Sequence, residues 1–112
     1  MSLEYRIERH EDTITVVPEG DVGIETVDVL REVLRSVIDS RRGGDIDIDM
    51  TAVTFLDSSG IGVLIAAQRA AAARDTRLTL SRPGPMVRMV LEVAHLDGVL
   101  LQTTRFGADD RG

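Results

Sequence analysis

The residues best suited to chemistry lie in one short run, Asp57-Ser58-Ser59-Gly60, at the predicted start of a helix. Asp and Ser at such a place accept hydrogen bonds from backbone N–H groups that lack a partner within the helix, so local chemistry alone favours capping. Gly60 and Gly62 do not fit capping, because each costs about 1 kcal/mol relative to alanine inside a helix. They indicate a surface kept bare around the serines, which lets another protein's backbone approach closely.

Ser58 is also a suitable site for phosphorylation. A phosphate there meets free N–H groups and the positive end of the helix dipole, so the fold should tolerate it. It adds about −1.5 to −2 charges to a patch that already carries Asp57, and this charge repels an acidic or apolar partner surface. Open α/β sheets usually place functional sites in the loops at this end of a parallel strand. We therefore expect a modification that changes binding and leaves the fold intact.

Catalysis by Ser58 or Ser59 is the weakest interpretation. A serine nucleophile needs a nearby base that a third group holds in place. The chain has two histidines, His10 in a predicted hairpin turn and His95 at a predicted helix end. The run also lacks the Gly-x-Ser-x-Gly pattern of a nucleophile elbow. The sequence thus predicts a protein that is not an enzyme.

Two further motifs favour ordinary structure over a binding site. Asp45, Asp47 and Asp49 alternate with apolar residues, but residues two apart on a strand are roughly 6.6 Å apart, too far for one small cation without other ligands. A solvated strand face is the better interpretation. The segment Gly20-Asp21-Val22-Gly23 lacks a Gly-x-Gly-x-x-Gly or Walker pattern and predicts a turn before a helix. No metal and no cofactor are predicted.

The elements that position the Ser58 run follow from hydrophobic periodicity. The strict alternation over residues 45–50 makes one sheet face wet, so helices should pack mainly on the other face. We predict an α/β domain with a mixed four- to five-stranded sheet and an antiparallel N-terminal hairpin. The predicted order is a hairpin of residues 3–7 and 14–17, a helix over 27–38, a strand over 45–50, a helix over 58–73, a strand over 78–80, a helix after Pro83-Gly84-Pro85 and an apolar piece over 99–101. The inner side of the helix over 58–73 is predicted to carry Ile61, Leu64, Ile65, Gln68 and Ala72. The inner side of the last helix is predicted to carry Val87, Val90, Leu91 and Ala94.

Composition excludes several classes of function. The 112 residues fit one domain, which we assign to residues 1–106, with a polar tail over 107–112. A net charge of −6 and 3% aromatic residues argue against direct nucleic-acid binding. The absence of cysteine excludes disulfides and thiolate metal sites and is compatible with a reducing cytoplasm. The sequence shows no secretory signal and no membrane-inserting stretch, so we expect a cytoplasmic location.

Two segments resemble one protein family. The segment Ile46-Asp47-Ile48-Asp49-Met50 and the following residues 53–62, with Asp57-Ser58-Ser59-Gly60-Ile61-Gly62 as their specific part, resemble the core signature of STAS domains. The nearer match is to bacterial anti-sigma factor antagonists, and the similarity in element order extends from the first hairpin to the Leu96-Asp97-Gly98 turn. The resemblance implies a mixed sheet packed by helices.

In such antagonists the first serine of the motif, here Ser58, is phosphorylated by an anti-sigma factor that is also a serine kinase and uses ATP. The resemblance implies that the unphosphorylated antagonist binds this kinase and frees the sigma factor for transcription, and that a separate serine phosphatase resets the switch. Asp57, Ser59 and Gly60 then belong to the partner-binding surface, with Ile61 and Gly62 close behind.

The sequence departs from the antagonist pattern before the first helix. Antagonists often carry Gly-x-Leu-Asp there, and this chain has Gly23 at the aspartate position, so Asp21 is the candidate to stand in as a partner contact. This departure keeps a second hypothesis open, a STAS scaffold or adaptor in a stress-signalling or lipid-transport complex that works without a phosphorylation switch. Whether the domain forms a homodimer also stays open.

Overall fold

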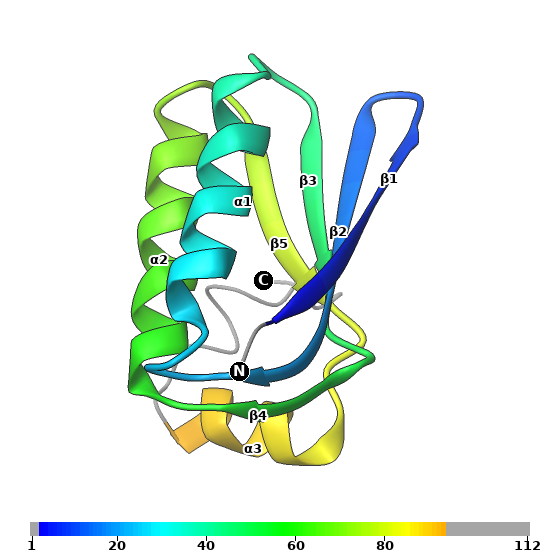
Figure 1. Ribbon diagram of the computed structural model, residues 1–112. Helices are drawn as coiled ribbons and strands as arrows, with labels where there is room; N and C mark the ends of the chain where they lie inside the picture. Colours follow the sequence, from blue (N-terminus) through cyan, green and yellow to red (C-terminus); the bar gives the residue numbers. More distant parts are fainter. Residues whose placement is uncertain (1–2, 94–112) are drawn as a thin grey trace, which may run out of the picture.

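The computed structural model of the chain describes residues 3–93 (Figure 1). Several predictions therefore lie outside the described residues. They concern Ala94, His95, the Leu96-Asp97-Gly98 turn, the apolar piece over 99–101, the domain boundary at 106 and the polar tail over 107–112.

One five-stranded mixed sheet forms the centre of the fold, as predicted. The N-terminal hairpin is antiparallel, and every other strand pair is parallel. The strand order is β1-β2-β3-β5, with β4 paired to β2 alone. The strands are β1 (Glu4–His10), β2 (Thr13–Val22), β3 (Asp45–Asp49), β4 (Val53–Leu56) and β5 (Arg77–Ser81).

The strand β2 bends and, besides its hairpin partner β1, pairs with two parallel strands, which the sequence did not predict. Its first half pairs with β3, and its last residues pair with β4 after an irregularity at Gly20. Gly20 has φ of 109°, a conformation that favours glycine, and its N–H donates to the Ala52 carbonyl at 2.9 Å. The predicted turn at residues 20–23 is therefore wrong for its first three residues, which belong to β2. The bend brings the end of β2 beside β4, directly before the helix that carries Ser58.

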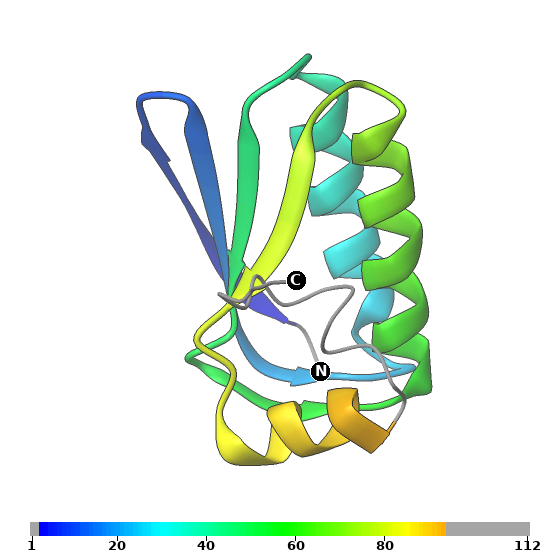
Figure 2. The same cartoon turned by 180° about the vertical axis from the view of Figure 1, so that it is seen from behind.

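Helices α1 (Val27–Asp39) and α2 (Ser58–Ala72) lie side by side on one face of the sheet, as predicted (Figures 1 and 2). The third helix, α3 (Pro85–Val93), lies across the end of the molecule against β4. Pro85 is its first residue, a position where the missing N–H costs nothing. Among the described helices the longest has 15 residues, and none combines the length and apolar character that a bilayer span requires.

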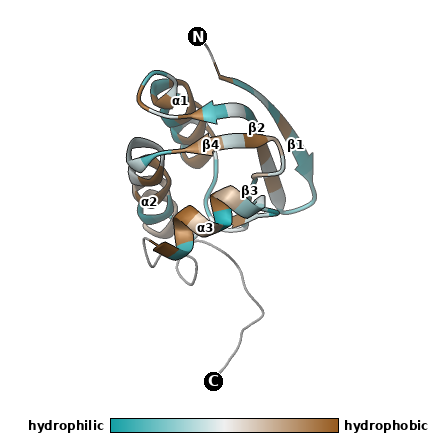
Figure 3. Ribbon diagram, turned by 90° about the horizontal axis from the view of Figure 1, so that it is seen from below, coloured by the Kyte–Doolittle hydropathy of each residue, from teal (hydrophilic) through white to brown (hydrophobic). Residues whose placement is uncertain are grey.

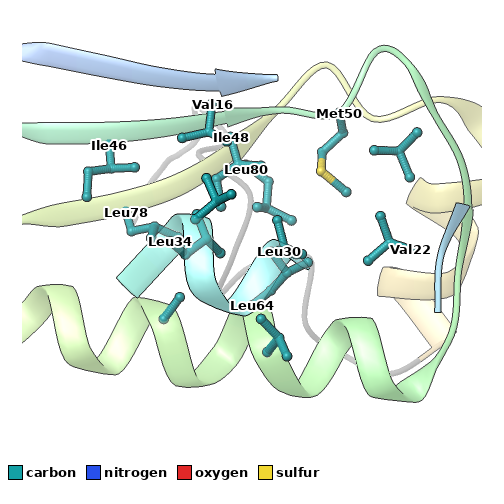
Figure 4. Close-up of a cluster of buried hydrophobic side chains, with 14 of the residues drawn as sticks. Val16, Val22, Leu30, Leu34, Ile46, Ile48, Met50, Leu64, Leu78 and Leu80 are labelled. Carbon is teal, nitrogen blue, oxygen red and sulfur yellow. The ribbon is translucent and has the colours of Figure 1, made fainter. Parts of the chain in front are cut away.

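The core fills the space between the sheet and the two long helices (Figure 4). Its β3 residues Ile46 and Ile48 and its α1 residues Leu30 and Leu34 are almost fully buried, which confirms the predicted inner faces of both elements. The inner face of α2 was predicted less well. Ala72 is exposed, and the buried residues of this helix are Gly60, Val63, Leu64, Ala67 and Ala71. An alanine-rich helix is apolar almost all round, so its periodicity does not fix the buried side.

Candidate functional site

Asp57, not Ser58, caps the start of α2. The Asp57 Oδ1 accepts a hydrogen bond from the Gly60 N–H at 3.1 Å, which satisfies one of the free N–H groups of the first turn. Its Oδ2 accepts a second bond from the Ile24 N–H at 3.2 Å. The Asp57 N–H donates to the Val22 carbonyl at 3.2 Å. One residue therefore ties the loop between β2 and α1 to the start of α2.

Ser58 is the first residue of α2, and its side chain is exposed. Within residues 3–93 the hydroxyl groups of Ser58 and the half-buried Ser59 make no hydrogen bond, since the cap is supplied by Asp57. The capping interpretation of Ser58 is thus wrong. Its hydroxyl lies at the positive end of the dipole of a 15-residue helix.

The two glycines of the motif do different things. Gly60 is buried, and an added Cβ would lie 2.7 Å from Leu56 Cδ1 and 2.8 Å from Val22 Cγ1. Gly60 therefore lets α2 pack closely on the strands, and its predicted place on a bare surface is wrong. Gly62 is exposed, with nothing within 4 Å of an added Cβ, as that prediction requires. Ile61, between them, is partly buried against the core.

Gly23 is explained by the position of Asp57. A Cβ at Gly23 would lie 2.9 Å from Asp57 Oδ2, the oxygen that bonds Ile24. An aspartate at position 23 would therefore displace the Asp57 carboxylate or place a second negative charge against it. The buried Thr26 holds the same loop, because its hydroxyl accepts from the Gly23 N–H at 3.0 Å and donates to the Asp21 carbonyl at 2.8 Å.

Asp21 lies near the end of β2, opposite Phe55 of β4. Its carboxylate accepts a hydrogen bond from the Thr54 hydroxyl on β4 at 2.6 Å, and within residues 3–93 it makes no other side-chain contact of this kind. The role of Asp21 in place of the missing aspartate stays a prediction. As an exposed residue at the end of β2, Asp21 remains a candidate contact at the edge of the site.

Two exposed apolar residues belong to this surface and were missed from the sequence. Ile24 is 76% exposed and Phe55 is 44% exposed, although both are large and hydrophobic. The Ile24 N–H donates to Asp57, and the Phe55 ring lies beside Gly23. The signal was weak, because an apolar residue in a short strand or before a helix usually belongs to the core. Together the two side chains supply exposed apolar area beside the cap of α2, which a partner protein could bury.

The nucleophile interpretation gains nothing from the structure. His10 is the last residue of β1, and the turn between β1 and β2 lies at the opposite end of the molecule from the start of α2 (Figure 1). His10 is 3.9 Å from Glu11 and exposed. His95 lies outside the described residues.

The aspartates of β3 form a second charged region, on the sheet face that α1 and α2 leave open. Asp45 is 3.3 Å from Arg77, and Asp49 is 2.7 Å from Arg82. Asp49 is only 8% exposed, so the predicted solvated face is wrong at this residue. Within residues 3–93 no group of acidic or histidine side chains could hold a metal ion.

The pKa values of two of these aspartates are displaced in opposite directions. Burial would raise the pKa of Asp49, but hydrogen bonds from Arg82 and Thr51 outweigh it and hold the pKa below its ordinary value. Burial raises the pKa of Asp47, and the neighbouring Asp49 charge adds to this effect. Asp49 is therefore held in its charged form by its partners, whereas Asp47, which has no ion pair within residues 3–93, is made less acidic by burial.

Comparisons with known proteins agree with this architecture. The family model described as "Mlab, STAS domain" matches residues 4–102. An anti-sigma-B factor antagonist of Listeria monocytogenes is 27% identical over 100 residues, which cover 89% of this chain and 86% of that protein. The crystal structure of an anti-sigma factor antagonist from Mycobacterium paratuberculosis has a TM-score of 0.78 at 23% identity and covers 91% of this chain and 87% of that one.

The anti-sigma factor antagonist SpoIIAA has a similar fold in two forms. Its unphosphorylated form has a TM-score of 0.72 at 24% identity and covers 91% of this chain and 90% of that chain. The phosphorylated form, described as a Bacillus cell fate determinant, has a TM-score of 0.67 at 22% identity, with coverage of 91% and 93%. At these identities the likeness establishes the fold.

Proposed function

This chain belongs to the STAS domain family, and we propose that it is an anti-sigma factor antagonist that binds its partner through the start of α2 and the adjoining β2–α1 loop. The observation that carries the proposal is the exposed Ser58, whose hydroxyl makes no hydrogen bond within the described residues while Asp57 caps the helix. Exposed Ile24 and Phe55 supply apolar contact area beside it. The relatives named as anti-sigma factor antagonists support the same assignment.

The proposed switch is phosphorylation of Ser58 by a partner that is both anti-sigma factor and serine kinase. The Ser58 Oγ attacks the γ-phosphorus of ATP, the bond to ADP breaks, and a base of the kinase takes the hydroxyl proton. The product breaks no existing hydrogen bond among the described residues, so the domain stays folded. The added charge beside Asp57 repels the partner and releases it. SpoIIAA, a relative solved with and without phosphate, supports such a modification.

The proposal implies further partners and a location. A serine phosphatase removes the phosphate by hydrolysis and restores binding. The kinase uses ATP, and both reactions take place in the cytoplasm. The protein itself performs no catalysis and contacts no DNA; it regulates transcription by holding the anti-sigma factor away from the sigma factor.

Incubation with the cognate anti-sigma kinase and ATP, followed by mass spectrometry, tests the switch. We expect one phosphate on the wild type and on Ser59→Ala, and none on Ser58→Ala. A Ser58→Ala protein that is still phosphorylated would refute the assignment. If Ser58→Ala and Ser58→Asp bind the partner equally well, the chain is instead a scaffold without a phosphorylation switch. Labelling of Ser58 by a fluorophosphonate probe would instead indicate a hydrolase.

A further inference from the structure

A groove of about 670 Å³ lies between α1 and α2, and Ser58 stands at one end of it. The groove extends along α2 from Ser58 to Ala70, a little over three turns and a length of roughly 18 Å at 1.5 Å per residue. Figure 3 shows α1 and α2 side by side. The groove is thus continuous with the surface proposed to bind the anti-sigma factor.

The two walls of the groove differ in chemistry. The α2 wall consists of small side chains at Ser59, Gly62, Ala66 and Ala70, and the last three are exposed. The floor of the groove is apolar and consists of the buried residues Leu34, Ile38, Val63 and Ala67. A wall of this kind lets a peptide backbone approach closely, because no side chain holds it away.

The α1 wall carries Arg31 and Arg35, one helical turn apart. Arg31 contacts Asp28 in an exposed pair, which is weak in water. Arg35 has no ion pair within residues 3–93, and Asp39 follows at the end away from Ser58. The lining of the groove thus carries two arginines and one carboxylate, a net positive charge in a chain whose net charge is −6.

We propose that the groove receives an acidic peptide segment of the binding partner, with carboxylates paired to Arg31 and Arg35 and backbone packed on Gly62 and Ala66. The identity of that partner as an anti-sigma factor rests on the proposed function. Arginine binds carboxylates through two parallel hydrogen bonds, which suits recognition of Asp or Glu. A phosphate on Ser58 stands in the same groove, attracts the same arginines and repels the segment's carboxylates. The groove therefore links modification to release.

Binding of the purified anti-sigma factor to groove variants tests this proposal. The double variant Arg31→Gln/Arg35→Gln should weaken binding about tenfold or more and flatten its dependence on salt concentration. The matched control Arg69→Gln/Arg88→Gln removes the same charge from exposed positions outside the groove and should bind like the wild type.

A second pair of variants tests the small wall. Ala66→Phe fills the groove and should weaken binding about tenfold, whereas Ala72→Phe, exposed on the same helix outside the groove, should not. Thermal melting of each variant verifies that the domain is folded. Unchanged affinity in both groove variants, with the Ser58 switch intact, would overturn the groove and leave the proposed function standing. A wild type that does not bind the anti-sigma factor would overturn both.

Discussion

The start of α2 and the open face of β3 both carry aspartates on rigid elements, but they use them differently. On β3, Asp45 and Asp49 are paired with arginines, so the charges are balanced within the molecule. At the start of α2, both carboxylate oxygens of Asp57 accept hydrogen bonds from backbone N–H groups. The hydroxyl of the neighbouring Ser58 makes no hydrogen bond among the described residues. The comparison shows that a polar group is available to a partner protein when neighbouring residues fix its position without using its hydrogen bonds. The ion pairs of β3 stabilise the fold, and the start of α2 offers an exposed hydroxyl for modification and binding.

The largest expected effect separates the two glycines of the motif. Gly60→Ala should lower the free energy of unfolding by up to about 3 kcal/mol, because its Cβ would press on Leu56 and Val22 in a packed core. Gly62→Ala should raise it by up to about 1 kcal/mol, since its Cβ meets open space and alanine favours the helix. Urea denaturation measures both. Equal effects would show that the close approach of α2 to the strands is not as described.

A smaller loss is expected on β3. Asp49→Ala should lower the free energy of unfolding at neutral pH by about 2 kcal/mol, because Asp49 is buried and bonded by Thr51 and Arg82. Asp45→Ala, which removes an exposed pair, should change it by no more than about 0.5 kcal/mol.

The pH dependence of the Asp49→Ala effect follows from the sign of the pKa shift. The pKa of Asp49 is below its ordinary value in the folded state, so the unfolded chain takes up a proton first as pH falls. The stabilisation is present above the ordinary aspartate pKa and disappears as pH falls through the lowered one. Denaturation at several pH values should show the wild type and Asp49→Ala converging in acid. A gap that widens in acid would contradict the account.

Removal of the α2 cap should have a smaller effect again. Asp57→Ala should lower the free energy of unfolding by about 1 kcal/mol and loosen the β2–α1 loop, because the Gly60 and Ile24 N–H groups both lose their acceptor. Ser58→Ala should change it by less than about 0.5 kcal/mol, since its hydroxyl makes no bond among the described residues. Amide hydrogen exchange at Ile24 should rise in the first variant and stay unchanged in the second.

The sequence predicted those parts whose periodicity is strong. Alternation and helical spacing were enough for the hairpin, α1 and β3. The four-residue β4 was missed as a separate strand because its apolar residues suit no single period. At the site, the run around Ser58 was found, but its geometry depends on contacts that pattern cannot reveal. Asp57 reaches Ile24, 33 residues away, and Gly60 is buried by side chains from two strands.

The most direct test compares the phosphorylated and unphosphorylated domain in two measurements on the same samples. With phosphate on Ser58, affinity for the anti-sigma factor should fall at least about 100-fold, or about 2.7 kcal/mol. The thermal midpoint and the circular dichroism spectrum should stay unchanged, because the hydroxyl makes no hydrogen bond within residues 3–93. Equal affinity of the two forms would contradict a phosphorylation switch at Ser58. A loss of affinity that comes with unfolding of the domain would contradict a switch that leaves the fold intact.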